Sequence, residues 1–340
     1  MKAAIVKGKK RIECEEVPKP SVEPGTLLLK TIYASICGSD LEYLDGTLES
    51  HMDQGPHAGS AVVQLWREVA TLRTGGILGH EYIAEIAEVG EGVGGWQVGQ
   101  RVVPRDQYMD EGYGAKGCMC EYFLRTPEYV LPALDNVSDE EAALVEPMGV
   151  SIGAVNWAEL NATDSLVIIG VGKIGLLALL YAKAIGVCPI IAIDIVKSRL
   201  DKAIEMGADI VLNAKEVDMV AEVLKITGGG ADAVIPCVRE GKVLNQAVEM
   251  VKMHGIIPIA GFIPPTEVDP ALWLVKEIRL LSFRGGPPGR KSPLVTAMHL
   301  MANKQVNVRP LITAIMPLDE VQKGFDSVYD TDNIVVLLKP

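Results

Sequence analysis

The chain has 340 residues, of which 49% are hydrophobic and 22% are charged, and its formal net charge is −12. This length favours two domains, each with its own hydrophobic core. The acidic balance, without a cluster of Lys and Arg, argues against binding to nucleic acid or to an anionic membrane, so the expected partner is a small molecule.

The first residues and the cysteines indicate the compartment. Met1 runs directly into the strand-like segment KAAIV, so we expect no secretory signal and a cytoplasmic protein. Six cysteines without any C-x-x-C spacing indicate buried thiols or a metal ligand, not disulfides. The apolar stretch 166–193 is long enough to span a membrane, but Lys173, Lys183 and its glycines favour a buried strand, helix and strand.

The first part of the chain, to about Leu134, is rich in β-branched residues, glycine and proline. The segments TLLLKTIYAS, EYIAEIAEVG, RVVP and EYFLRTPEYVLP have the composition of strands broken by turns. They predict an antiparallel β domain. Between Ser138 and Ala158 the pattern becomes helical, and SDEEA supplies an N-cap and an acidic first turn.

From Leu166 onward, strands and helices alternate. The six predicted strands are LVIIG, PIIAID, DIVLN, DAVIPC, GIIPIAG and IRLLSF. Helices are predicted over about 174–185 and through SRLDKAIEMGA, AEVLKIT and VLNQAVEMV. This alternation predicts an α/β fold with a doubly wound parallel sheet. We therefore expect one domain over 1–147, completed by about 290–340, and a second over 148–289.

A glycine-rich turn joins the first of these strands to the first helix. Its residues are Gly170, Gly172, Lys173, Ile174 and Gly175. The three glycines form G-x-G-x-x-G, which is weak evidence alone. Between a strand and a helix, however, it favours a dinucleotide pyrophosphate at the helix N-terminus over a tight turn without a ligand.

Asp194 ends the next predicted strand, nineteen residues beyond Gly175. Its carboxylate is placed to accept hydrogen bonds from the adenosine ribose, and it would repel a 2′-phosphate, so NAD is favoured over NADP. Arg199 lies close enough in sequence to weaken that preference, and a solvated helix charge is the alternative interpretation of this residue.

Cys37 opens the segment CGSD at the end of a predicted strand. A lone cysteine is more often a core residue than a ligand, but LGHEYIAEI supplies His80 and Glu81, and ALVEPMGVS supplies Glu146. Cysteine, histidine and carboxylate are ligands of catalytic Zn²⁺, in which three protein groups leave one position open. Asp40 is then the expected hydrogen-bond acceptor for the far nitrogen of His80.

The ordered set CGSD, GHE, VGEGVGGWQVGQRVVP and GVGKIG, followed by Asp194, resembles the zinc-dependent medium-chain alcohol and polyol dehydrogenases over nearly the whole chain. The resemblance implies a GroES-like catalytic domain joined to a Rossmann domain, with the active site in the cleft between them. It makes Cys37 and His80 zinc ligands and Glu81 a ligand or a close neighbour. Glu146 matches a carboxylate of sorbitol-type enzymes, which favours a polyol, sugar or other secondary alcohol; a structural carboxylate at a helix start is the alternative.

Two departures from the family bear on the chemistry. Only Cys118 and Cys120 stand where the family carries four cysteines for a structural zinc, so we expect one catalytic zinc and no structural zinc. Many relatives have a relay histidine where this chain has Glu42. Glucose-type dehydrogenases also carry glutamate there, and a solvated loop carboxylate is the alternative. By resemblance, Ser39 takes the hydroxyl proton and Glu42 completes the relay.

A third departure is the long interval between Leu41 and Leu78. The part from Gly55 to Gly76 is expected to add a helix near the active-site mouth, with His51 and His57 on the surface.

Two other functions were weighed against an NAD-dependent zinc dehydrogenase. The zinc-free quinone and enoyl reductases use NADPH but lack the cysteine and histidine pair, and CGSD with GHE argues against them. A nucleotide-binding protein without turnover would not need the zinc and proton-relay positions. The resemblance also implies a homodimer or homotetramer, in which the apolar segment IRLLSF could pair between subunits.

Overall fold

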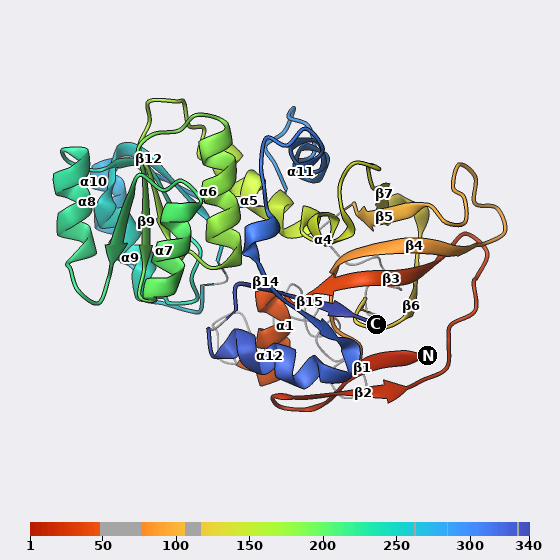
Figure 1. Ribbon diagram of the computed structural model, residues 1–340. Coiled ribbons are helices and arrows are strands. Elements are labelled where there is room, and N and C mark those ends of the chain that lie inside the picture. Colours follow the sequence, from red (N-terminus) through yellow and green to blue (C-terminus); the bar gives the residue numbers. More distant parts are fainter. Residues whose placement is uncertain (48–75, 106–116, 262, 284, 332) are drawn as a thin grey trace. The chain divides into compact units, whose positions relative to one another are not determined.

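The computed structural model describes residues 1–47, 76–105, 117–261, 263–283, 285–331 and 333–340 (Figure 1). The chain divides into two compact units. Unit 1 consists of Met1–Glu146 and Arg309–Pro340, and unit 2 consists of Pro147–Val308. The expected extra helix, together with His51 and His57, lies outside the described residues.

Unit 1 is built on a seven-stranded sheet with the order β14-β15-β3-β4-β5-β7, in which β6 also pairs with β3. Its strands are β3 (Leu27–Ser35), β4 (Glu81–Val89), β5 (Arg101–Pro104), β6 (Tyr122–Arg125), β7 (Val130–Pro132), β14 (Ile312–Pro317) and β15 (Val335–Lys339). A separate hairpin joins β1 (Lys2–Gly8) to β2 (Arg11–Glu16). The predicted antiparallel strands therefore form, and β14 and β15 add a parallel pair at one edge.

The sheet of unit 1 is closed by strands far apart in sequence. β15 pairs antiparallel with β3, so that Leu337 lies opposite Ser35. Buried apolar side chains from alternate positions of these strands form a core, in which the Tyr82 and Phe123 rings meet edge to face with centroids 4.9 Å apart. This packing fixes the end of β3, which leads into the segment that carries Cys37.

The helices in the described residues of unit 1 are short. They are α1 (Gly38–Asp45), α4 (Asp139–Ala142) and α12 (Val321–Tyr329), with 3₁₀ turns η1 (Pro127–Tyr129), η2 (Arg309–Leu311) and η3 (Leu318–Glu320). The predicted N-cap of α4 is confirmed: the Ser138 side chain accepts the N–H of Glu141 at 3.3 Å, while the Glu141 carboxylate accepts the N–H of Ser138 at 3.2 Å. Two backbone donors at this helix start are thereby satisfied.

Unit 2 contains a six-stranded parallel sheet with the order β10-β9-β8-β11-β12-β13. Its strands are β8 (Leu166–Ile169), β9 (Ile190–Asp194), β10 (Ile210–Asn213), β11 (Ala231–Pro236), β12 (Val251–Ile259) and β13 (Arg279–Ser282). The order of the strands reverses between β8 and β11, as in a doubly wound dinucleotide-binding sheet. The fold predicted from the alternating pattern is confirmed.

Helices cover both faces of this sheet (Figure 1). The helices described in unit 2 are α5 (Val145–Trp157), which begins at the end of unit 1, α6 (Lys173–Ala184), α7 (Lys197–Glu205), α8 (Met219–Thr227), α9 (Lys242–Met250), α10 (Pro270–Lys276) and α11 (Pro293–Ala302), of which α11 lies apart from the sheet. α8 and α9 bury apolar side chains against one face of the sheet. None of the helices in the described parts of the chain is long and apolar enough to cross a membrane.

The second boundary between the units lies later than the expected return near residue 290. Residues 290–308 belong to unit 2, and the chain enters unit 1 again at Arg309. The packing of α11 explains this difference. A Cβ placed on Gly149 of α5 would lie 2.9 Å from Cγ of Leu294, so the two helices are in close contact within unit 2.

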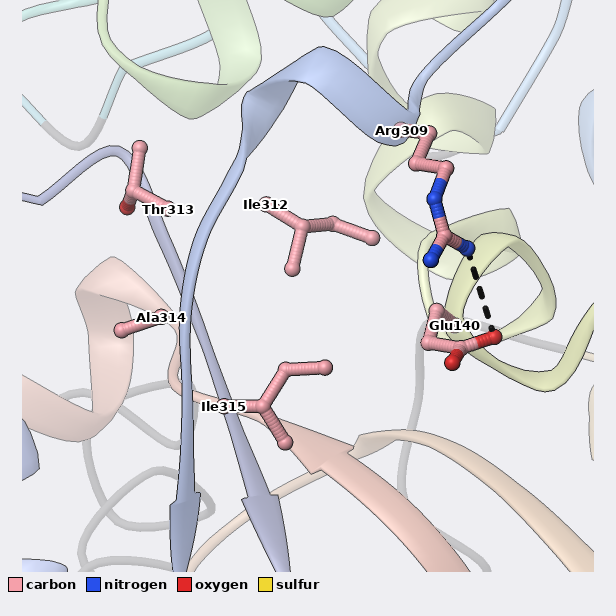
Figure 2. A pocket seen from close by; sticks show the side chains of 6 residues that line it. All are labelled: Glu140, Arg309, Ile312, Thr313, Ala314 and Ile315. Atoms are coloured by element: carbon pink, nitrogen blue, oxygen red, sulfur yellow. Dashed lines mark ion pairs between the residues drawn. The ribbon is translucent and has the colours of Figure 1, made fainter.

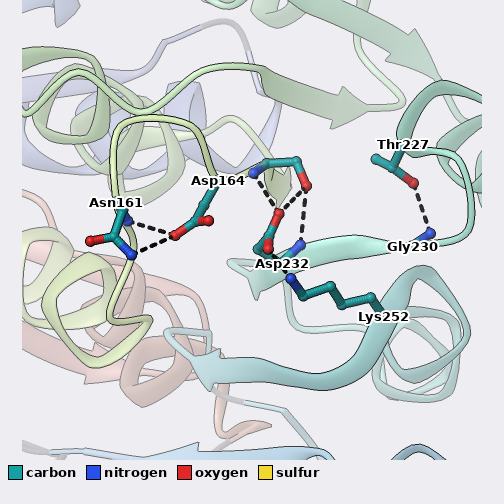
Figure 3. A network of polar contacts seen from close by, with 7 residues as sticks. Asn161, Asp164, Thr227, Gly230, Asp232 and Lys252 are labelled. Atoms are coloured by element: carbon teal, nitrogen blue, oxygen red, sulfur yellow. Dashed lines mark hydrogen bonds and ion pairs between the residues drawn. The ribbon is translucent and has the colours of Figure 1, made fainter.

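A polar network joins the N-terminal ends of β8 and β11 (Figure 3). The N–H and the hydroxyl of Ser165 donate to one carboxylate oxygen of Asp232 at 2.8 and 2.7 Å, and Lys252 forms an ion pair with the other. Burial alone would raise the pKa of Asp232, but the hydrogen bonds from Lys252 and Ser165 outweigh it and lower that pKa below its usual value. The carboxylate is therefore stabilised in its charged form.

Replacing Asp232 by asparagine is expected to lower the free energy of unfolding at pH 7 by about 1–3 kcal/mol, because a charged acceptor of several hydrogen bonds is lost. The pKa of Asp232 is lower in the folded state, so its stabilisation is present above the unfolded pKa of about 4 and is lost as the pH falls through the folded value. Urea unfolding of both proteins between pH 7 and pH 2 would show this. A difference that stays constant down to pH 2 would contradict it.

Candidate functional site

Cys37 lies between the end of β3 and the start of α1, where it is the N-cap residue with φ −88° and ψ 155°. Its N–H donates to Oδ2 of Asp40 at 2.9 Å. Asp40 lies in the first turn of α1, and its carboxylate thus caps the backbone of the residue before the helix. The thiol is half-buried. The local sequence CGSD thus holds the cysteine in one backbone conformation at a helix start.

His80 and Glu81 lie where the chain enters β4. Gly79 precedes them with φ +100°, a conformation that favours glycine. Its N–H donates to Oδ1 of Asp40 at 3.1 Å. One carboxylate group therefore connects the Cys37 turn to the segment that carries His80 and Glu81.

The side chains of Cys37, His80 and Glu81 form a cluster that could hold a metal ion. Their ligand atoms all lie within 4.8 Å of one another, with Glu81 buried and the other two half-buried. Zinc takes sulfur at about 2.3 Å and nitrogen or oxygen at about 2.0–2.2 Å, so its ligand atoms lie at most about 4.5 Å apart. Small side-chain movements would bring these three groups around one ion, and the donor types fit zinc.

The charges around His80 also favour a cation. Burial by itself lowers the pKa of His80, but the neighbouring Cys37, Glu146 and Asp40 raise it more, and the net pKa lies well above 6.5. The site thus stabilises positive charge on or beside the imidazole. A divalent cation satisfies the same requirement.

Two carboxylates predicted for this site are placed differently from the cluster. Oδ1 of Asp40 lies 4.0 Å from Nδ1 of His80, which is an ion-pair distance but too long for the expected hydrogen bond. Asp40 instead accepts the two backbone N–H groups described above. Glu146 is buried in the first turn of α5 and is close enough to raise the pKa of His80, but it is not a member of the cluster found among the described residues.

The two residues predicted for the proton relay lie on α1. Ser39 is half-buried in the first turn, and Glu42 is only 2% exposed. The alternative of a solvated loop carboxylate therefore does not describe Glu42, because its side chain is within the protein.

The glycines of the turn after β8 have different physical roles. A Cβ on Gly175 would lie 2.0 Å from the carbonyl oxygen of Gly170, so only glycine lets α6 approach the turn this closely. Gly170 has φ +89°. At Gly172, the N-cap of α6, a Cβ would meet only a terminal nitrogen of Arg199 at 3.8 Å. This space in front of a helix N-terminus is suited to a phosphate group.

Asp194 ends β9 as predicted, and its carboxylate accepts the N–H groups of Val171, Ile195 and Val196 at 2.7–2.9 Å. The acid thereby ties its own strand end to the glycine-rich turn. Nε of Arg199 is buried and has no hydrogen-bond partner within the described part of the chain. A buried donor beside Gly172 is consistent with an anionic or hydroxyl-bearing ligand there and fits less well with a solvated charge.

Cys118 and Cys120 are both fully buried in the segment that precedes β6. Burial raises the pKa of Cys118 well above its usual value and that of Cys120 to about 12. Both are therefore neutral thiols in the metal-free protein. The expectation of a single zinc per chain stays a prediction, because residues 106–116 lie outside the described residues.

Sequence reasoning missed the contacts that support the ligand segment. Cys118 packs against Gly79, and a Cβ on Gly117 would lie 2.0 Å from the carbonyl oxygen of Leu78. Gly79 is recognisable in the sequence as the glycine of the GHE motif. Its contact with Cys118, 39 residues later, cannot be inferred from the sequence.

A cavity of about 220 Å³ lies beside β14 in unit 1 (Figure 2). It is lined by Glu140, Arg309, Ile312, Thr313, Ala314 and Ile315. The Arg309 guanidinium and the Glu140 carboxylate form an ion pair at 3.6 Å on one side of it. None of the predicted site residues lines this cavity, and we assign it no function.

Comparison with known proteins identifies the family. Residues 23–135 match the alcohol dehydrogenase GroES-like domain, and residues 174–303 match the zinc-binding dehydrogenase domain. The (R,R)-butanediol dehydrogenase of Bacillus subtilis is 31% identical over 360 residues, covering 100% of both chains. The sorbitol dehydrogenase of Bombyx mori is 27% identical, covering 95% of this chain and 94% of that protein. The crystal structure of 2R,3R-butanediol dehydrogenase from Bacillus subtilis superimposes with a TM-score of 0.82 at 28% identity, covering 100% of this chain and 99% of that one.

The chain belongs to the zinc-dependent medium-chain dehydrogenase family. This confirms the resemblance, the combination of a GroES-like and a Rossmann domain, and the prediction of an oxidoreductase that acts on CH–OH groups. Zinc and a nicotinamide dinucleotide are the cofactors that this family and the Cys37, His80 and Glu81 cluster imply.

Proposed function

We propose that the protein transfers a hydride between NAD and a secondary alcohol that carries a second hydroxyl nearby, in a polyol, diol or sugar. The observation that carries the proposal is the cluster of Cys37, His80 and Glu81 in unit 1. Unit 2 of the same chain has a glycine-rich turn with space at a helix N-terminus, which supports the dinucleotide. Together these features supply a cation site and a hydride carrier, the two requirements of this reaction.

Cys37, His80 and Glu81 would hold the zinc ion, with Glu146 as a further carboxylate near the site. When bound, zinc supplies Lewis acidity that favours loss of the proton from an alcohol hydroxyl. Asp40 would keep the two ligand-bearing segments together, because it accepts one backbone N–H from each. Three protein ligands leave a position for the substrate, as in other catalytic zinc sites.

The proton of the substrate hydroxyl would pass to Oγ of Ser39 and then toward the carboxylate of Glu42. Both residues lie on α1, soon after Cys37, and their spacing of three residues puts them on the same face of the helix. Glu42 is buried, so it would act as a base shielded from bulk water.

Replacing Glu42 by glutamine is expected to lower kcat near neutral pH by about 10- to 100-fold, because an amide cannot accept the proton. The deficit should shrink at high pH, where the substrate hydroxyl loses its proton without the help of this base. The measurement is kcat against pH for both enzymes. A pH profile that keeps its shape would reduce Glu42 to a structural carboxylate.

We infer that NAD is preferred over NADP. Asp194 places a carboxylate at the end of β9, where it would repel a 2′-phosphate, and its position nineteen residues after Gly175 is that of a ribose-binding acid. Gly170, Gly172, Lys173, Ile174 and Gly175 would surround the pyrophosphate. Arg199 would contribute the buried Nε donor beside this turn.

The substrate class follows from the relatives and from one residue. The similar enzymes are named for butanediol and sorbitol, which both carry several hydroxyl groups. Glu42 stands where glucose-type enzymes of the family also have glutamate, which favours a sugar or cyclic polyol. We propose a compound of this kind as the substrate. We also propose that the protein acts in the cytoplasm, because a reducing compartment suits its six free thiols.

The test combines metal analysis with turnover. The protein is purified without chelator, zinc per chain is measured by elemental analysis, and NADH or NADPH formation is followed across sugars, cyclic polyols and vicinal diols. We expect one zinc per chain and turnover with NAD. Full activity without metal would refute the zinc-dependent reaction, and zinc with activity on simple primary alcohols alone would refute the substrate class.

We also propose that the protein is a homodimer or homotetramer. β13 is an edge strand of the parallel sheet, and the preceding α10 exposes 79% of Leu274 and 69% of Val275. Exposed apolar residues beside an open strand edge are typical of an interface.

Replacing Leu274 by glutamate is expected to convert the oligomer to monomers, because a charge would be buried in the interface. Light scattering after gel filtration measures the change in mass. Ile204 on α7 is 55% exposed and provides the control, since its replacement by glutamate should leave the mass unchanged. A monomeric wild-type protein, or an unchanged mass for the Leu274 variant, would contradict the prediction.

A further inference from the structure

The segment 117–119 lies directly against the segment that carries the metal ligands. Three of its backbone N–H groups donate to carbonyl oxygens of residues 77–79 at 2.9–3.1 Å. The pairs are Gly117 to Ile77, Cys118 to Gly79, and Met119 to Leu78. The ligand segment is therefore held along its length before it enters β4.

Cys118 contacts both neighbours of His80 in sequence. Its N–H donates to the carbonyl of Gly79 at 3.1 Å, and its thiol donates to the backbone carbonyl of Glu81 at 3.7 Å. Sγ also occupies the space beside Gly79, where an added Cβ would approach it to 2.9 Å. The residues on either side of His80 are thus held by one residue, Gly79 by its backbone N–H and by packing of its sulfur, and Glu81 by its thiol.

Cys118 is itself held from another strand. The hydroxyl of Thr31, on β3, donates to the carbonyl oxygen of Cys118 at 3.1 Å, and both residues are buried. β3 also leads into the segment of Cys37. The same strand therefore supports Cys37 and, through Thr31, holds Cys118.

We propose that Cys118 is a positioning residue of the metal site, which holds Gly79 and Glu81 so that His80 and Glu81 meet Cys37 around the ion. The proposal rests on the metal site of the proposed function. Groups that orient the ligands of a metal influence its affinity by about 10- to 100-fold when they are removed. Loss of the thiol would leave a gap beside Gly79 and remove the hydrogen bond to Glu81.

Cys120 provides a matched control within the same segment. It is also a fully buried thiol, but its sulfur donates to the carbonyl oxygens of Gly117 and Tyr122, at 3.5 and 3.3 Å, and not to the ligand segment. Truncation of either cysteine removes one buried sulfur from the same core. A purely structural role would therefore affect both variants alike.

The experiment measures the release of zinc from the purified holoenzyme to a chromogenic chelator in wild type, Cys118→Ala and Cys120→Ala, together with thermal unfolding of the metal-free proteins. We expect zinc release about 10-fold or more faster in Cys118→Ala than in wild type, and within about twofold of wild type in Cys120→Ala. The metal-free variants should lose similar stability. If either alanine variant does not fold, Cys118→Val and Cys120→Val replace the pair, because valine fills the space of the thiol but has no donor for the carbonyl of Glu81. Faster release is again expected only at position 118.

Equal release from Cys118→Ala and wild type would overturn the inference while leaving the zinc site intact. Equal acceleration in both cysteine variants would also overturn it, because general loosening of the core would then explain the result. Wild-type protein that retains no zinc would refute the metal site, and the inference with it.

Discussion

Replacing Cys37 by alanine is expected to remove zinc and to lower kcat/KM by at least about 1000-fold, because two remaining ligands cannot hold the ion that activates the hydroxyl. The fold should be retained, because Cys37 is only half-buried and the hydrogen bond from the backbone N–H of residue 37 to Asp40 is kept in the variant. Elemental analysis, steady-state kinetics and circular dichroism measure the three quantities. Cys188, which is exposed in unit 2, is the control, and its alanine variant should retain zinc and activity.

The same measurement separates the two carboxylates. Glu81→Gln should lose more zinc than Glu146→Gln, because only the Glu81 carboxylate lies within the 4.8 Å cluster. The reverse order would make Glu146 the direct ligand and Glu81 its neighbour. If the Cys37→Ala enzyme keeps both zinc and turnover, Cys37 is a core thiol and not a zinc ligand.

Replacing Gly172 by alanine is expected to weaken NADH binding by at least about 10-fold without loss of stability, because a methyl group would occupy the space through which the backbone approaches the pyrophosphate. The protein itself has room for this group, whose nearest neighbour would be Arg199 at 3.8 Å. Gly175→Ala should weaken binding and also destabilise the protein by about 1–3 kcal/mol, since its Cβ would collide with the backbone of Gly170.

Calorimetric titration with NADH and urea unfolding distinguish the two effects. If Gly172→Ala binds NADH as tightly as wild type, the space at the start of α6 is not the phosphate site. If Gly175→Ala is as stable as wild type, the contact between α6 and the turn is less tight than the structure indicates.

The parallel sheet was predictable because each of its elements has a local signal. The strands are short apolar segments, and the helix after the glycine-rich turn was placed at about 174–185, against Lys173–Ala184 in the structure. Most strands pair with the strand next to them in sequence, and only the crossover from β10 to β11 returns past β9 to the other side of β8.

The parts that the sequence did not predict depend on contacts between distant residues. In the sequence, Cys118 cannot be distinguished from an ordinary core cysteine. Only its packing against Gly79 shows that it supports the segment with the metal ligands. Asp40 was placed near His80 correctly, but two backbone N–H groups compete for its carboxylate, which a residue pattern does not reveal. Nothing in the sequence indicated whether Glu42 is exposed or buried, and the structure shows that it is buried.

The pairing of β15 with β3 has a consequence for the order of events during synthesis. Ser35 meets Leu337 roughly 300 residues later, so the sheet of unit 1 cannot be completed until the whole of unit 2 has been translated. Until then the end of β3 at Ala34 and Ser35 lacks its β15 partner, although β6 already pairs with residues 27–30 of the same strand. Closing so long a loop is slow and exposes this end to wrong partners. The nascent chain thus forms its nucleotide-binding unit as a contiguous segment, while the strand that leads to Cys37 awaits β15, which follows unit 2 along the chain.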